Sequence, residues 1–412
     1  MTGRLNVTLD FSGVGEGIAV GQLGWDRTQR EVVAEWDADF PQAGLNVSPL
    51  LVKSYSGLLR PKARAFGELP GLFGDSLPDG WGRLLIDRTL TSRGKSRSEI
   101  TDLDRLAMVG SHGMGALCYR PEDDYPIEDD LDLDWFDGLV PEIGNDVAAE
   151  DLERLRGIAG GSQGARPKFV AILDEANERL HDHRMPLEDG WRHVLAKRRA
   201  QGDVEGAVEA EAAYSDLARA AGVEMTPVAV LRASEGEPYF ITDRFDRQEN
   251  ERLHMQTVAA LLDVDFRTAQ LDYIELLKVV RMMTRDYREV EQMFRRMVFN
   301  ARVMNRDDHL KNHAFLMDAS GEWRLAPAYD VSFSLGPGGE HTLLIAGEGR
   351  RPGREHFLEA AKKAGIKEKR AAEIVEEIDG VVRDWSGYAD VRDVPSVLRK
   401  QIAEEIKIAL TW

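Results

Sequence analysis

Val303-Met-Asn-Arg-Asp-Asp-His-Leu-Lys-Asn-His-Ala-Phe-Leu-Met317 is the most informative stretch of this chain. It places Asp307 five residues before Asn312, and a second acid, Asp330, follows at the end of Ala326-Pro-Ala-Tyr-Asp330. The pair Asp307 and Asn312 is weak by itself, because such a pair arises by chance about once in a chain of this length. Its meaning therefore depends on the residues around it.

An acid, an amide and a second acid in this order suit phosphoryl transfer. One carboxylate orients and deprotonates an attacking hydroxyl, while an Asn oxygen and a second carboxylate hold magnesium on nucleotide phosphates. The spacing Asp307 to Asn312 matches a protein-kinase catalytic loop, and Asp330 stands where the metal-binding acid of a kinase follows. Asp308 is the alternative base, but the spacing favours Asp307. A hairpin predicted over residues 315–325 would return Asp330 to this loop.

Two upstream segments carry groups that suit nucleotide phosphates. Gly160-Gly-Ser-Gln-Gly-Ala-Arg-Pro-Lys168 is rich in small residues, which let backbone N–H groups approach an anion closely. It lacks the Gly-Lys-Ser/Thr ending of a P-loop, and a β-turn before a strand is the alternative. His193-Val-Leu-Ala-Lys197 reads as a strand that ends in a lysine, which is either a phosphate ligand or a surface lysine.

Periodicity, turns and caps divide the chain into four parts. We expect an N-terminal α/β subdomain at 1–125, an acidic connector at 126–150, a small-lobe-like region with the glycine-rich loop at 151–247, and a helical lobe at 248–412. Strands are predicted at 5–11, 17–25, 31–36, 169–173, 193–197, 226–231 and 238–245. Helices are predicted at 81–91, 102–110, 208–222, 273–284, 287–304, 354–364, 367–383 and 394–410.

Composition excludes several classes of function. The 412 residues carry a net charge of -19, which disfavours direct binding to nucleic acid, although a basic partner could bring the protein to DNA. The single cysteine, Cys118, excludes an internal disulfide and a zinc site built on several thiolates. No signal pattern or apolar run of membrane-spanning length is found, so a cytoplasmic protein without membrane contact is expected.

Taken together, these segments resemble HipA-type serine/threonine kinases, the toxins of bacterial type II toxin–antitoxin systems. The match rests on Leu77–Gly80 with Leu103–Leu117, on Gly161–Lys168, on Tyr239–Arg247, and on Asn305–Asn312 with Pro327–Asp330. The segments occur in the order of the family and span nearly the whole chain. The resemblance implies an α+β, two-lobed protein-kinase-like fold, with an N-terminal α/β subdomain and a mainly helical C-terminal lobe.

The resemblance also implies roles for individual residues, with ATP and Mg²⁺ as cofactors. Asp307 would be the catalytic base, and Asn312 and Asp330 would hold magnesium. The residues implied to bind ATP are Gly161, Ser162, Gln163, Gly164, Ala165, Lys168, Lys197, Asp243, Phe245 and Lys311. Ser162 is the only serine of the glycine-rich loop, displaced by one position from the serine that the family autophosphorylates, and is a possible autophosphorylation site.

The leading hypothesis is an ATP-dependent protein serine/threonine kinase. The resemblance implies a helix-turn-helix, HipB-like antitoxin as partner and a protein substrate such as an aminoacyl-tRNA synthetase, with DNA contacted only through the antitoxin. One alternative is a regulatory or binding module that keeps the kinase fold and acts with such an antitoxin. Another is a kinase of a small molecule, since the motifs serve either acceptor.

Overall fold

The computed structural model describes residues 3–15, 17–62, 64–123, 125, 127, 129–144, 147–161, 163–234, 236–269 and 271–412. The chain forms two compact units, each built from separate stretches of sequence. Unit 1 comprises Met1–Gln201, Leu231–Asp265 and Leu316–Glu322, and unit 2 comprises Gly202–Val230, Phe266–Phe315 and Trp323–Trp412.

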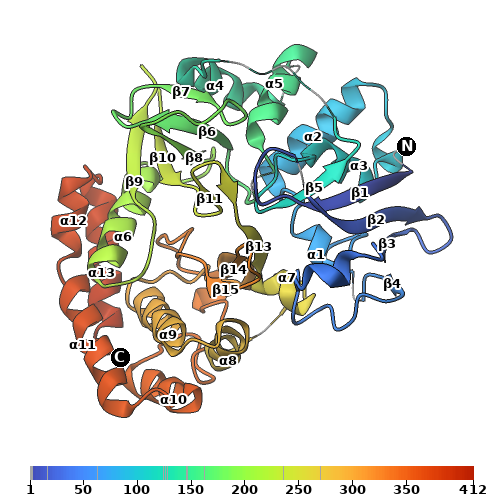
Figure 1. The fold of residues 1–412 in the computed structure, drawn as a ribbon. Coiled ribbons are helices and arrows are strands. Elements are labelled where there is room, and N and C mark those ends of the chain that lie inside the picture. Colours follow the sequence, from blue (N-terminus) through green and yellow to red (C-terminus); the bar gives the residue numbers. More distant parts are fainter. Residues whose placement is uncertain are drawn as a thin grey trace. The chain divides into compact units, whose positions relative to one another are not determined.

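The first sheet of unit 1 has the strand order β4-β3-β2-β1-β5 (Figure 1). Its strands are β1 (Arg4–Leu9), β2 (Ile18–Asp26), β3 (Glu31–Trp36), β4 (Leu58–Leu59) and β5 (Leu117–Arg120). In β1, buried Leu5, Val7 and Leu9 alternate with more exposed residues, which is the pattern that predicted a half-buried strand. The same unit contains α1 (Gly71–Gly74), α2 (Gly80–Ser92) and α3 (Asp102–Val109).

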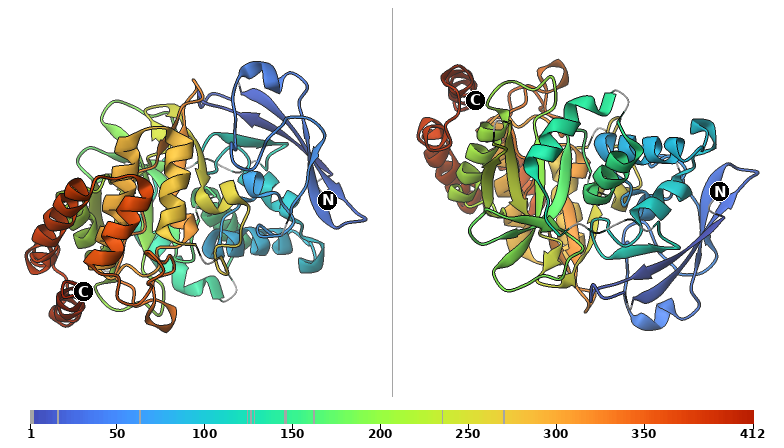
Figure 2. Two further views of the ribbon diagram at one scale, coloured as in Figure 1. Left: turned by 90° about the horizontal axis from the view of Figure 1, so that it is seen from below. Right: turned by 90° about the horizontal axis from the view of Figure 1, so that it is seen from above.

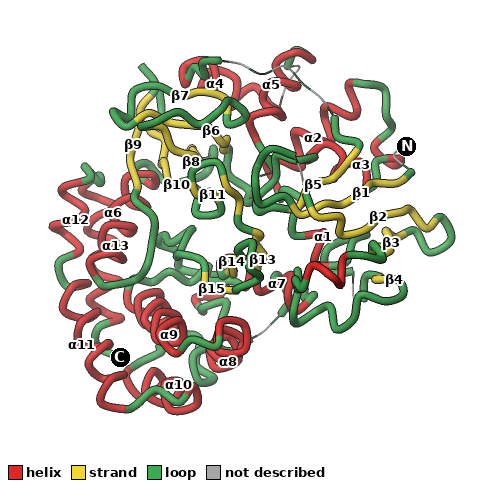
Figure 3. The backbone as a smooth tube through the Cα atoms, in the orientation of Figure 1, coloured by secondary structure: helices red, strands yellow, loops and turns green. Residues whose placement is uncertain are grey.

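The second sheet has the order β7-β6-β8-β10-β9, and its strands are drawn yellow in Figure 3. They are β6 (Lys168–Asp174), β7 (Leu180–Asp182), β8 (Trp191–Arg198), β9 (Val228–Arg232) and β10 (Pro238–Asp243). Helix α5 (Ala149–Ala159) packs on β6, and α4 (Leu133–Leu139) brings Phe136 to 4.7 Å from Phe169 between ring centroids. Sequence patterns did not predict α4, α5 or β7, and α4 lies inside the stretch that we interpreted as a connector.

Shorter elements complete unit 1. They are β11 (Arg247–Gln248), β12 (Glu251–Arg252), β13 (His254–Thr257) and α7 (Val258–Leu262). Beside them lies a buried ion cluster in which Asp246 accepts hydrogen bonds from Arg244, from Arg247 and from the N–H of Gly115. Burial alone would raise the pKa of Asp246, but the two guanidinium groups lower it well below its ordinary value.

Unit 2 is mainly helical, as the sequence predicted. Its helices are α6 (Ala207–Ala220), α8 (Tyr273–Thr284), α9 (Tyr287–Arg302), α10 (Arg354–Ala364), α11 (Glu368–Val382), α12 (Trp385–Val391) and α13 (Ser396–Ala409). Asp272 and Asp286 cap α8 and α9, which pack side by side (Figures 1 and 2). Strands β14 (Ala314–Met317) and β15 (Trp323–Leu325) form the predicted hairpin, of which Leu316–Glu322 belongs to unit 1. The N–H of Ala326 closes the hairpin by donating to the carbonyl of Ala314.

Single turns of 3₁₀ helix connect these elements. They are η1 (Phe40–Ala43), η2 (Arg97–Glu99), η3 (Val140–Gly144), η4 (Leu310–Asn312) and η5 (Pro337–Gly339). In the part of the chain that the structure describes, no helix has the length and apolar character needed to cross a membrane.

The ion cluster of unit 1 predicts a strong dependence of stability on one carboxylate. Asp246→Ala leaves Arg244 and Arg247 buried without their counter-charge, so it should lower the free energy of unfolding by about 3–5 kcal/mol. Urea unfolding followed by tryptophan fluorescence measures this loss. Arg60→Ala is the control, because it breaks exposed pairs with Asp26 and Glu31 and should change the unfolding little. Equal effects of the two substitutions would contradict the prediction.

Candidate active site

The loop between α9 and β14 separates two adjacent acids by burial. After α9 ends at Arg302, the chain exposes Asp307 to solvent and buries Asp308, whose exposed fraction is 1%. A carboxylate that takes a proton from a substrate must be accessible to that substrate. Of these two neighbours, only Asp307 meets this condition, in agreement with its spacing to Asn312.

Asp308, in contrast, is buried and anchors the loop through hydrogen bonds to other parts of unit 2. Its carboxylate accepts hydrogen bonds from the hydroxyl of Tyr273, at 2.9 Å, and from the N–H of Thr342, at 3.2 Å, and His341 Nδ1 lies 3.4 Å away. Burial by itself would raise the pKa of Asp308, but His341 and Tyr273 lower it below its ordinary value. The acid therefore stays ionised and holds the loop to α8 and to residues 341–342. No local pattern in the sequence indicates this role.

Hydrogen bonds to backbone carbonyls of the loop involve Asn312 and the residue before Asp330, the two candidate metal ligands being Asn312 and Asp330. Asn312 Nδ2 donates to the carbonyl of Asp307, at 2.8 Å, so the amide oxygen of Asn312 is the atom that suits a cation. The Tyr329 hydroxyl donates to the carbonyl of Lys311, at 2.5 Å, and so holds the residue before Asp330 against the loop. Asp330 is exposed and has a positive φ of 54°. One carboxylate and one amide oxygen fit Mg²⁺ that is otherwise bound by phosphates and water.

The described part of the chain contains no group of three or more His, Cys, Asp or Glu side chains that could hold a metal ion. Lys311 is buried in the same loop, and its ammonium nitrogen lies 5.2 Å from the ring centroid of Phe266. The Phe266 ring also packs against His309, at 4.6 Å between ring centroids, so the same ring contacts both basic residues of the loop.

In unit 1 the strand register places the two predicted lysines directly opposite each other. Lys168, the first residue of β6, pairs with Lys197 of β8, and Phe240 of β10 pairs with Lys197 on the other side. Residues directly opposite in a sheet lie on the same face, so the two lysines share one face. Both are buried, with exposed fractions of 6%. The sequence predicted both residues separately but not that they would be cross-strand neighbours.

The glycine-rich loop folds back on Lys168. The ammonium group of Lys168 donates to the carbonyl of Gln163. Gly161 and Gly164 have φ of 66° and 104°, a backbone conformation that favours glycine. Ala165 is exposed. The possible autophosphorylation site, Ser162, lies outside the described residues.

A segment of the first subdomain supports this loop. The Gln163 side-chain amide donates to the carbonyl of Asp75, at 2.5 Å. The backbone N–H of Trp81 donates to the carbonyl of Gly164, at 3.4 Å, and its indole N–H donates to the carbonyl of Lys168, at 3.0 Å. Trp81 and Lys168 are 87 positions apart in the sequence, so no local pattern could have revealed this contact.

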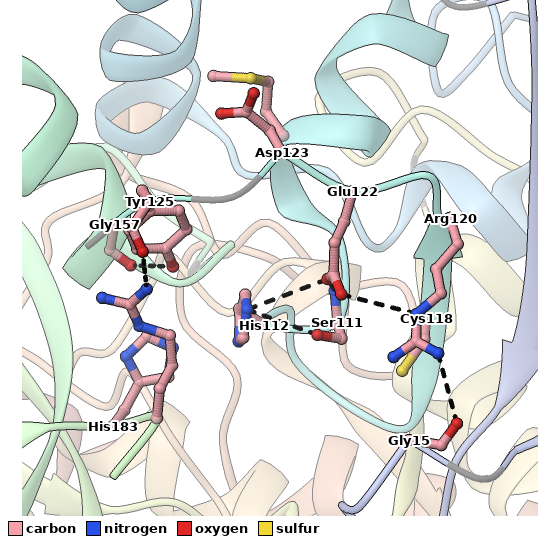
Figure 4. A network of polar contacts seen from close by, with 12 residues as sticks. Gly15, Ser111, His112, Cys118, Arg120, Glu122, Asp123, Tyr125, Gly157 and His183 are labelled. Atoms are coloured by element: carbon pink, nitrogen blue, oxygen red, sulfur yellow. Dashed lines mark hydrogen bonds and ion pairs between the residues drawn. The ribbon is translucent and has the colours of Figure 1, made fainter. Parts of the chain in front are cut away.

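A polar network near the start of the loop contains Ser, His and Glu but not a catalytic triad (Figure 4). Glu122 accepts from the N–H of Ser111, at 2.6 Å, and His112 Nε2 lies 3.5 Å from the Ser111 hydroxyl and 4.0 Å from Glu122. A triad needs the two ring nitrogens to serve the two partners separately, whereas here one nitrogen faces both. Burial lowers the pKa of His112, so it is a neutral structural group.

The predicted adenine-binding residues lie at the end of β10. Arg192 Nε donates to the Asp243 carboxylate, at 2.9 Å, and Phe245 is partly buried two residues further on. Burial raises the pKa of Asp243, against the effect of Arg192.

The fold and the site together define a protein of the α+β, two-lobed protein-kinase-like class. Unit 1 contains an antiparallel sheet with a glycine-rich loop and paired lysines, and unit 2 is mainly helical and contains the Asp307–Asn312 loop and Asp330.

Within that class, the chain belongs to the HipA family. The model of the HipA N-terminal domain matches residues 14–120, and that of the HipA-like C-terminal domain matches residues 160–385, more than half of the chain. A protein of Sinorhizobium fredii, "Putative kinase Y4mE", is 28% identical over 303 residues, which cover 70% of this chain and 68% of that protein. HipA of Shewanella oneidensis MR-1, solved with HipB and its operator DNA, has the same fold, with a TM-score of 0.69 at 15% identity over 99% of this chain and 96% of that one.

The different burial of the adjacent acids predicts unequal effects of their substitution on stability. Asp308→Ala removes the charge that satisfies Tyr273 and Thr342 and should destabilise unit 2 by about 3 kcal/mol. Asp307→Ala changes an exposed side chain and should alter the free energy of unfolding by less than about 1 kcal/mol. Urea unfolding of the two variants provides the comparison. If Asp307→Ala were the more destabilising, the anchoring role of Asp308 would be wrong.

Proposed function

We propose that the protein is an ATP-dependent protein serine/threonine kinase of HipA type. The observation that carries the proposal is the geometry around the catalytic loop of unit 2. An exposed acid, Asp307, shares one short loop with Asn312, and a hydrogen bond from Tyr329 links the residue before Asp330 to that loop. Membership of the HipA family and the likeness to a relative named as a kinase support this assignment.

In the proposed reaction, Asp307 accepts the proton of the acceptor hydroxyl as its oxygen bonds to the γ-phosphorus, and ADP leaves. Asn312 and Asp330 hold the magnesium, which neutralises phosphate charge. Lys168 and Lys197, side by side in the sheet of unit 1, bind phosphate oxygens as cationic donors. Asp308 keeps Asp307 in place, so catalysis rests on positioning and electrostatics.

We also propose a small basic antitoxin of HipB type as a partner, with DNA contacted through it. The net charge of -19 favours a partner of opposite charge and opposes direct contact with DNA. The HipA of Shewanella oneidensis was solved together with HipB and operator DNA, which supports the same kind of assembly here.

The proposed base predicts a selective loss of chemistry. Asp307→Asn keeps the shape of the side chain but cannot accept the proton, so kcat should fall about 10²-fold or more while ATP affinity is retained. Incubation with γ-labelled ATP and a lysate measures transfer to proteins, and calorimetry measures ATP binding. Full activity of this variant would exclude Asp307 as the base. Label found in a small molecule rather than in protein would favour the small-molecule kinase.

The proposed metal site predicts a loss of magnesium-dependent binding. Asp330→Ala removes the carboxylate ligand, so calorimetric titration with ATP should lose the gain in affinity that Mg²⁺ gives to the wild-type protein. Glu373→Ala, which removes an exposed carboxylate from α11, is the control and should keep that gain. An unchanged magnesium dependence in Asp330→Ala would contradict this role.

A further inference from the structure

We propose that the segment Asp75–Trp81 positions the glycine-rich loop for nucleotide binding, with Trp81 and Gln163 as positioning residues of the site. The inference rests on the proposed function, because it assigns the loop to the phosphates of ATP. On this proposal, the N-terminal part of unit 1 belongs to the nucleotide site and is not a separate module.

The segment Asp75–Trp81 contacts the loop at three residues, through the side chain of Gln163 and the carbonyls of Gly164 and Lys168. Gln163 reaches the carbonyl of Asp75, the N–H of Trp81 reaches the carbonyl of Gly164, and the Trp81 indole reaches the carbonyl of Lys168. Gly80 approaches closest to Ala165: a Cβ atom at Gly80 would lie 2.8 Å from the Cα of Ala165. Two donors of Trp81 therefore hold the loop carbonyls of Gly164 and Lys168, and a donor of the loop, the Gln163 amide, binds the segment in return.

The support is itself anchored inside unit 1. Asp75 is buried, and its carboxylate accepts from the N–H of Thr257, at 2.7 Å, and from the Thr257 hydroxyl, at 2.8 Å. The N–H of Gly71, at the start of α1, donates to Asp263, at 3.0 Å. Gln163 Nε2 also lies 3.3 Å from the Asp75 carboxylate. A buried, doubly hydrogen-bonded carboxylate is a rigid point of attachment.

In the proposed catalytic cycle, the ammonium group of Lys168 has two alternative partners, the carbonyl of Gln163 and the phosphates of ATP. Its ammonium group donates to the carbonyl of Gln163 in this structure, and phosphate oxygens would compete for the same donor. The Trp81 indole holds the Lys168 carbonyl, and Asp75 holds the Gln163 side chain. The ammonium group of Lys168 can therefore leave the Gln163 carbonyl while the loop backbone stays in position. Pre-ordering of this kind lowers the entropy lost on binding.

The test uses Trp81→Phe and Gln163→Ala in the full chain. Trp81→Phe removes the indole donor and keeps the ring, and Gln163→Ala removes the amide donor from a partly exposed side chain. Trp135→Phe is the matched control, because its indole donates to Asp151, outside the loop. Hydrogen exchange of the amides of residues 163–168 is measured without nucleotide, and kcat, KM for ATP and calorimetric ATP affinity are measured with magnesium.

Each loop variant should show faster exchange at residues 163–168 and a KM for ATP raised about five-fold, the effect of one hydrogen bond, with a smaller change in kcat. The control should behave as wild type in both measurements. Unchanged exchange, or faster exchange with unchanged ATP affinity, would overturn the positioning role. Wild-type protein that binds no ATP would instead overturn the proposed function, and the exchange measurement would still report whether the segment holds the loop.

Discussion

A carboxylate that is closed off from water must find its partners within the protein, and Asp308 does so through Tyr273, His341 and Thr342. These partners come from α8 and from a segment more than thirty positions further along the chain, as the separations of 33 and 34 residues to Asp308 show. The loop that carries Asp307 therefore cannot shift without leaving a buried charge unsatisfied. In this way a buried residue fixes the place of its exposed neighbour.

Other contacts of unit 2 extend the same constraint. The Tyr214 hydroxyl of α6 donates to the carbonyl of Val303, at 2.7 Å, where the loop begins, and the Tyr329 hydroxyl donates to the carbonyl of Lys311 near its end. Both ends of the loop are thus tied to other elements by buried or partly buried tyrosines. A hydrogen bond to a backbone carbonyl does not involve the side chain of the residue that accepts it. Such bonds therefore fix the path of the loop backbone and leave the exposed side chains of the loop available for catalysis.

Local interactions explain what could be predicted from the sequence. The helix Tyr273–Thr284 has its predicted bounds because an Asp cap and an apolar period are encoded within its own turns. The spacing between Asp307 and Asn312 is likewise a local feature that can be read directly from the sequence. The anchoring role of Asp308 could not be predicted, because it depends on burial by residues remote in sequence. The three-residue strand β7 was missed for a related reason: its pairing with β6, not its composition, makes it a strand.

The left-handed backbone at Asp330 places two independent requirements on one residue. A φ of 54° is tolerated by Gly, Asn and Asp, and is strained for longer or branched side chains. The proposed metal ligand needs a carboxylate, which only Asp supplies among these three. An evolutionary replacement by Asn or Gly would therefore keep the fold and abolish the charge. A single-nucleotide change in this codon would turn an enzyme of this architecture into a stably folded relative that can bind but has no catalytic activity.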